Sequence, residues 1–125
     1  MTLTGTTGNF GIDGVDVLQL SQFAQTAIHT TLGNTEVWNI YNQTEFEHYF
    51  HMHDVQFQIL SIDGSPPPAV EAGWKDTVLV GASRTVQIVM QFLDYADANN
   101  AYMLHCHIVT HEDDGMMATF YVDPN

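Results

Sequence analysis

The chain has 125 residues, 45% of them hydrophobic and 14% charged, a composition that excludes disorder and fits one globular domain with a buried core. Two basic side chains, Lys75 and Arg84, oppose fifteen acidic ones, and the resulting formal charge of -13 repels phosphate backbones and anionic lipid while it attracts cations. We therefore expect no nucleic-acid partner and no membrane partner, and the longest apolar stretches are well short of the roughly 20 residues of a membrane span.

Most of the sequence consists of short β-branched and aromatic runs separated by glycine, proline, asparagine and aspartate. This pattern is typical of an all-β sandwich or barrel. The strands predicted, in chain order, are Asn9 to Ile12, Thr26 to Thr31, Glu36 to Asn42, Gln56 to Ile62, Thr77 to Val80, Thr85 to Phe92, Ala101 to His105 and Met116 to Val122. Residues 16–23 have mixed periodicity and predict a helical turn or an irregular loop. Without a repeat or linker, we expect a single domain over residues 1–125.

Six of the seven histidines fall in two short clusters, HYFHMH at residues 48–53 and HCHIVTH at residues 105–111. Successive side chains on extended backbone point to opposite faces of a sheet. In the first cluster, His51 and His53 therefore share a face, and His48 points to the other one.

The second cluster has the same alternation. His105 and His107 share a face, and Cys106, the only cysteine, points away from it. A single cysteine excludes an intrachain disulfide and leaves a buried thiol or a ligating one. One chemical set thus contains His48 and Cys106. The other contains His51, His53, His105 and His107.

The first set suits a blue-copper centre. Four residues separate Cys106 from His111 and four more separate His111 from Met116, so a loop can return both side chains towards the thiolate. With His48 they supply two imidazoles, a thiolate and a thioether, which is the ligand set of a blue-copper electron-transfer centre. Zinc is the competing metal, but it prefers a closed tetrahedral set, and no CxxC pair is present. Taken singly, Cys106 and Met116 also fit a core and His48 fits a loop cap; taken jointly, their spacing favours the metal.

The four histidines of the second set have no place at the blue site. Imidazoles gathered on adjacent strands form either a further metal site or a costly polar patch, and we favour the metal site. His29 lies outside both clusters, and we expect a structural role for it.

The stretches HYFHMHDVQF and HCHIVTHEDDGMM resemble the two copper signatures of the last cupredoxin domain of multicopper oxidases, the family of laccases, bilirubin oxidases, spore-coat oxidases and cuprous oxidases. GWKDTVLV, at residues 73–80, is similar to the segment between these signatures in bacterial members, and FGIDG is similar to the opening strand. The resemblance covers most of the chain from about residue 36 and implies a Greek-key β-sandwich, cupredoxin-like. Two positions depart from the family pattern: Tyr49 replaces the usual proline and Asp54 the usual glycine.

Matched position by position, the family pattern implies a copper cofactor at two kinds of site. The implied ligands of the mononuclear type 1 copper are His48, Cys106, His111 and Met116. The implied ligand of the type 2 copper is His51, and those of the type 3 pair are His53, His105 and His107. These are half of the histidines that the family's trinuclear cluster needs. The resemblance therefore implies a partner, an N-terminal cupredoxin domain or a neighbouring subunit, that supplies the others.

The family reaction removes electrons singly from a small reducing substrate and collects them to reduce dioxygen to water. The resemblance makes Cys106 the relay, because its sulfur binds one copper while the adjacent His105 and His107 bind the others. Glu112 is the predicted proton donor, with an exposed acidic loop residue as the alternative. For Asp76, a structural role in a turn or a strand ladder explains the residue at least as well as a carboxylate that orients a ligand imidazole.

Two other functions remain open for this sequence. A stand-alone blue-copper electron carrier would use the first set alone, but it leaves the four further histidines without a purpose. A copper-storage module would bind copper without the blue absorption band. For an oxidase domain, we expect no turnover from this chain alone. Copper chemistry and the family's habits imply a periplasmic or secreted setting, which one unpaired cysteine does not contradict.

Overall fold

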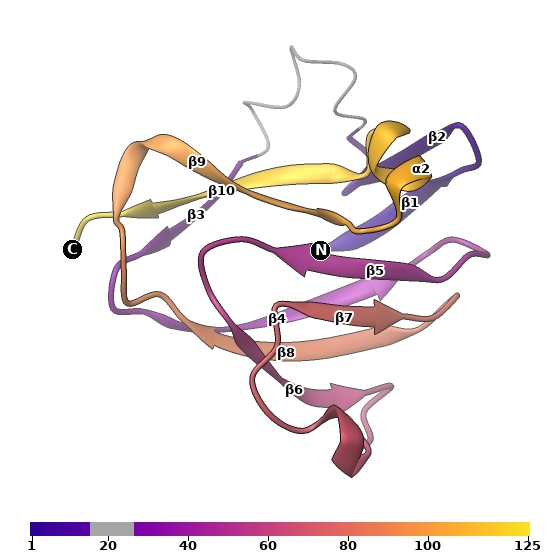
Figure 1. Cartoon of the computed structure of the whole chain (residues 1–125), viewed down its shortest axis with the longest axis horizontal. Helices are drawn as coiled ribbons and strands as arrows, with labels where there is room; N and C mark the ends of the chain where they lie inside the picture. Colours follow the sequence, from indigo (N-terminus) through magenta and orange to yellow (C-terminus); the bar gives the residue numbers. More distant parts are fainter. Residues whose placement is uncertain (16–26) are drawn as a thin grey trace.

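The computed structural model describes residues 1–15 and 27–125, which form two five-stranded sheets packed against each other (Figure 1). The first sheet contains β1 (Thr2–Thr6), β2 (Asn9–Ile12), β4 (Thr35–Asn42), β6 (Phe57–Ile62) and β8 (Thr85–Gln91), in the spatial order β2-β1-β4-β8-β6. The second contains β3 (Ile28–Thr31), β5 (His48–Met52), β7 (Thr77–Val80), β9 (Asp97–Cys106) and β10 (Met117–Asp123), in the order β3-β10-β9-β5-β7.

Two short helical segments interrupt the strands. The 3-10 helix η1 (Ala69–Glu71) lies between β6 and β7, and helix α2 (Val109–Asp113) connects β9 to β10. In the described residues, no helix is long and apolar enough to cross a membrane. Figure 1 shows α2 beside β2 at one end of the sandwich.

The core lies between the sheets and follows from the alternation of each strand. In β8, Val86, Ile88 and Met90 are buried, while the residues between them are half-buried. In β5, Phe50 and Met52 face the same core. The predicted all-β sandwich is confirmed.

Most predicted strands agree with the structure to within one or two residues at each end. The prediction for residues 101–105 is too short, since β9 begins at Asp97. Strands β1 and β5 are absent from the prediction, although the face argument treats the first histidine cluster as extended. The predicted turn or loop at residues 16–23 lies outside the described residues, as does Thr26 at the start of a predicted strand.

Phe120 of β10 links the two sheets, because its ring contacts Trp38 of β4 and Phe92, which follows β8. It is fully buried. We expect Phe120→Ala to lower the free energy of unfolding by about 3–5 kcal/mol through lost burial and a residual cavity. Urea unfolding of the metal-free chain measures this, with Tyr121→Ala on the half-buried side of the same strand as the control. Equal losses from both variants would contradict the assigned core.

Candidate metal centre

Strands β5 and β9 lie side by side and carry the two histidine clusters. In their antiparallel register Phe50 pairs with Cys106 and His51 pairs with His105. Residues directly opposite each other across a ladder share a face. Cys106 therefore turns inward with Phe50 and is buried, whereas His105 lies on the outer side with His51. The structure shows the separation into two faces that the alternation predicts.

Three potential ligands converge on the inner side; we call His48, Cys106 and His111 the inner group. The Sγ of Cys106 lies 3.6 Å from Nδ1 of His48 and 3.7 Å from Nδ1 of His111. The two Nδ1 atoms are 3.0 Å apart. Atoms bound to one metal ion have such separations, because metal–nitrogen and metal–sulfur bonds are about 2.0 and 2.3 Å long.

Helix α2 and the turn after it return the chain to Cys106. The turn contains Gly115, whose φ of 99° lies in the left-handed region that glycine adopts without strain. The N–H of Met116 donates to the carbonyl of His111 at 3.0 Å, and the N–H of Cys106 donates to the carbonyl of Met116 at 3.0 Å. Met116, the predicted axial ligand, is thereby held beside the inner group with its side chain fully buried.

The protonation of the inner group suits a metal that binds nitrogen and sulfur. Burial, reinforced by the nearby His111, lowers the pKa of His48 to about 4. Burial also lowers the pKa of His111, so both imidazoles are neutral near pH 7. Burial raises the pKa of the Cys106 thiol, which therefore loses its proton only when a metal displaces it. Two imidazoles and a thiol without a carboxylate fit copper and do not fit hard, oxygen-seeking cations.

Copper binding to the inner group is expected to release one proton, from Cys106, since the pKa values of His48 and His111 lie below neutrality. The apparent affinity should then rise about tenfold per pH unit between about pH 6 and pH 8. Competition titrations followed at the thiolate-to-copper band measure this slope. A flat profile would contradict the protonated, buried thiol.

A second set of imidazoles gathers on the outer side of the same strands; we call His51, His53, His105 and His107 the outer group. Ligand atoms of the first three lie within 4.8 Å of one another. The Nε2 atoms of His53 and His105 are 3.4 Å apart. His107 is exposed, and its ring centroid lies 5.2 Å from that of His51 and 5.5 Å from that of His105. All four predicted residues are thus neighbours, and their roles as ligands stay a prediction.

Neighbouring groups orient two rings of the outer group. Nδ1 of His51 lies 2.9 Å from the carbonyl of Asp76 and 3.0 Å from Oγ1 of Thr77. Nδ1 of His105 lies 3.1 Å from the carbonyl of Cys106 and 3.6 Å from a carboxylate oxygen of Glu112. An N–H donated from Nδ1 leaves Nε2 free for a metal, and such partners are usual behind histidine ligands.

These contacts extend the sequence predictions. Glu112 lies beside His105, a member of the outer group, and its proton-donor role stays a prediction. Asp76 contacts His51 mainly through its backbone. His29, assigned a structural role, bonds Asp123 at 3.0 Å and stacks on Tyr121, away from both groups.

Sequence reasoning missed three residues near the predicted ligands: Thr44 and Thr77, which contact His48 and His51, and Asn42, which contacts Thr44. Thr44 and Asn42 are buried behind His48, and Thr77 is bonded to His51. None of the three titrates in the physiological range, so no charge or metal-ligand spacing identifies them. The position of Asn42 at the end of β4, just before a bend in the chain, was the available signal.

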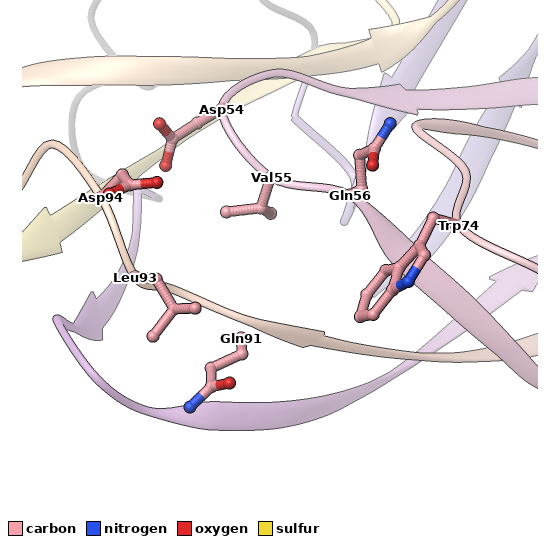
Figure 2. A pocket seen from close by; sticks show the side chains of 7 residues that line it. All are labelled: Asp54, Val55, Gln56, Trp74, Gln91, Leu93 and Asp94. Carbon is pink, nitrogen blue, oxygen red and sulfur yellow. The ribbon is translucent and has the colours of Figure 1, made fainter.

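Asp54, the departure from the family's glycine, has a φ of 74°, in the region that favours glycine and that aspartate tolerates. The turn after His53 is therefore kept. Figure 2 shows Asp54 on the wall of a surface hollow that it shares with Asp94 and Trp74. Burial, reinforced by Asp94, raises the pKa of Asp54.

Comparison with known proteins agrees with this arrangement. The multicopper oxidase family matches residues 2–125. The chain is 35% identical to a laccase of Bacillus stratosphericus over 94% of this chain and 26% of the relative. It is 36% identical to the bilirubin oxidase of Albifimbria verrucaria over 71% of this chain and 16% of that protein. The McoA multicopper oxidase of Aquifex aeolicus has a TM-score of 0.84 and 30% identity over 98% of this chain and 28% of that one.

The chain thus spans about a quarter of the length of the laccase and of the McoA structure. The predicted cupredoxin-like sandwich is confirmed by this structural likeness, since nearly the whole chain is covered. The inner group has the histidine and cysteine donors of a type 1 copper site. Its fold, its family match and its donor set agree: the chain belongs to the multicopper oxidase family.

Proposed function

We propose that this chain is the domain through which electrons enter a copper-dependent oxidase that reduces dioxygen to water. The observation that carries the proposal is the back-to-back placement of two donor groups on one strand. Cys106 turns into the inner group, while the adjacent His105 belongs to the outer group. When bound, copper supplies one-electron redox chemistry at the inner group and oxygen reduction at the completed outer cluster.

His111 is the inner-group side chain that reaches the surface. Cys106 is 2% exposed and His48 and Met116 are 0% exposed, whereas His111 is half-buried. We propose that a small reducing substrate approaches here, since His111 is the least buried side chain of the inner group and its Nδ1 lies 3.7 Å from the buried sulfur. The complete burial of His48 and Met116 keeps bulk water away from the inner group.

The backbone of Cys106 joins the two groups. Its peptide bonds lead directly to His105 and His107, and Nδ1 of His105 also lies 3.1 Å from the Cys106 carbonyl. An electron leaving the sulfur therefore crosses a few covalent bonds rather than a solvent gap. Glu112 lies 3.6 Å from the same imidazole nitrogen, and this distance supports its proposed role in holding a proton near the outer group.

The outer group is open on one side. His53 and His107 are exposed, and the neighbouring Tyr49 and Leu79 are 44% and 42% exposed. We propose that an N-terminal cupredoxin domain or a neighbouring subunit covers this face and supplies the remaining histidines. A periplasmic or secreted setting is our expectation for such an enzyme.

Oxygen uptake tests the proposal and its alternative. The copper-loaded chain alone should show the blue band and one-electron redox chemistry, with no sustained oxygen consumption. The parent protein, in which the proposed N-terminal domain or neighbouring subunit completes the outer group, should consume one dioxygen for every four electrons supplied. Because the inner group is complete within this chain, a stand-alone electron carrier is the second candidate. A blue parent that consumes no dioxygen would decide for that carrier.

A further inference from the structure

A buried row of hydrogen-bonded polar side chains lies behind His48, on the side opposite Cys106. Nε2 of His48 is 2.7 Å from Oγ1 of Thr44, and this hydroxyl is 2.8 Å from Oδ1 of Asn42. Exposed fractions are 0% for His48, 4% for Thr44 and 0% for Asn42. The amide nitrogen of Asn42 lies within hydrogen-bond distance of three backbone carbonyls, those of Phe46, Val80 and Gly81, which share its two N–H donors.

The directions of the hydrogen bonds that link Asn42, Thr44 and His48 follow from the orientation of the Asn42 amide. Since three carbonyls surround Nδ2 of Asn42, Oδ1 must face Thr44, where it also accepts the N–H of Thr44 at 2.9 Å. A carbonyl oxygen only accepts, so the single hydroxyl proton of Thr44 points to Oδ1 or to the carbonyl of Phe46. The Thr44 oxygen is then left to accept the N–H of His48.

We propose that Thr44, anchored by Asn42, is a positioning residue that fixes the ring and tautomer of His48 for copper. It keeps the proton on Nε2 and leaves the lone pair of Nδ1 directed at the space shared with Cys106 and His111. The opposite tautomer would put the proton on Nδ1, the atom that faces Cys106 and His111, and would leave no lone pair there for a metal. The copper part of this inference rests on the proposed function; the tautomer does not.

An asymmetry between the two imidazoles follows. In the metal-free chain, His48 accepts at Nδ1, so the 3.0 Å contact requires His111 to donate its Nδ1 proton. His111 is half-buried and exchanges that proton when a metal binds, whereas His48 needs no change. Thr44 thus fixes the tautomer of the buried ligand His48 before metal binding, whereas the half-buried ligand His111 changes its tautomer when the metal binds.

Nitrogen-15 NMR of the copper-free chain tests the tautomer without any metal. His48 should show a protonated Nε2 and a bare Nδ1, and in Thr44→Val the two tautomers should become mixed. Thr44→Ser, which keeps the hydroxyl, should restore the wild-type pattern. A wild-type His48 with its proton on Nδ1 would overturn the inference, even if the valine variant fails to fold.

Copper titration and potentiometry test the consequence for the metal. We expect Thr44→Val to lower the copper affinity of the blue centre about 10- to 100-fold, as for other residues behind ligands. Without the Thr44 oxygen to accept its Nε2 proton, His48 becomes a weaker metal ligand. This disfavours Cu(II) relative to Cu(I), so the reduction potential should rise. A tenfold greater loss for Cu(II) than for Cu(I) corresponds to about 59 mV. Thr44→Ser should remain close to wild type in both measurements.

Thr30→Val is the matched control, because Thr30 is a buried threonine whose hydroxyl bonds the side chain of Glu36. It pairs with Val122 of β10, at the opposite end of that strand from Met116. This variant should lose stability without a change in potential. Equal potentials in the two valine variants would overturn the positioning role. A wild-type chain without a blue band would instead refute the proposed function and leave the NMR result to decide the tautomer.

Discussion

Replacing Cys106 with serine is expected to abolish the blue colour of the copper-loaded chain. The intense visible band arises from charge transfer between a thiolate and copper, and a hydroxyl group has no equivalent transition. Cys106 is also the only cysteine, so no other residue can provide the thiolate. Copper affinity at the inner group should fall as well, because the remaining donors there are two neutral imidazoles and a thioether.

Visible absorption and electron paramagnetic resonance, recorded at one copper per chain, measure this effect. His29→Gln is the control, since His29 bonds Asp123 and lies outside both donor groups. It should keep the full band and the narrow copper hyperfine splitting. A serine variant that retained the blue band would show that the sulfur is not a copper ligand.

Replacing His53 with alanine is expected to separate oxygen reduction from the blue centre. In the proposed parent oxidase, this variant should lower the rate of oxygen reduction by more than the 10- to 100-fold that is usual when a residue behind a metal ligand is replaced, because His53 itself belongs to the outer group. Its Nε2 lies 3.4 Å from that of His105, on the opposite side of the strands from Cys106. The blue band should remain, since no inner-group contact involves His53.

Oxygen uptake and the visible absorption of the blue band, measured on the same sample, test this prediction. His29→Gln again serves as the control and should keep both signals. An oxidase with His53→Ala and full oxygen uptake would remove the outer group from the reaction. Loss of both the blue band and oxygen uptake would show that the two groups are not independent.

The separation of the two sites was predictable because it depends only on strand alternation. The predicted division of His48 and Cys106 from the other four histidines needs extended backbone and no tertiary detail. The structure adds the register, in which His51 pairs with His105 and brings the two motifs together. Pairing of distant strands depends on the whole sheet and cannot be read from either motif.

Other parts depend on contacts that the sequence does not reveal. Helix α2 is only five residues long, too short for a recognisable hydrophobic period, yet it determines where His111 lies. Strand β1 contains Thr and Gly residues with little apolar signal and is held by pairing with β2 and β4. Thr44 is a common turn residue, and its burial against His48 becomes visible only in three dimensions.

Anomalous diffraction at the copper absorption edge, from crystals of the chain loaded with one equivalent of copper, tests the central claim most directly. We predict one strong peak bonded to Nδ1 of His48, Sγ of Cys106 and Nδ1 of His111, with the sulfur of Met116 on its axis. A copper ion found only among His51, His53 and His105, with none at Cys106, would contradict a complete blue-copper site in this chain.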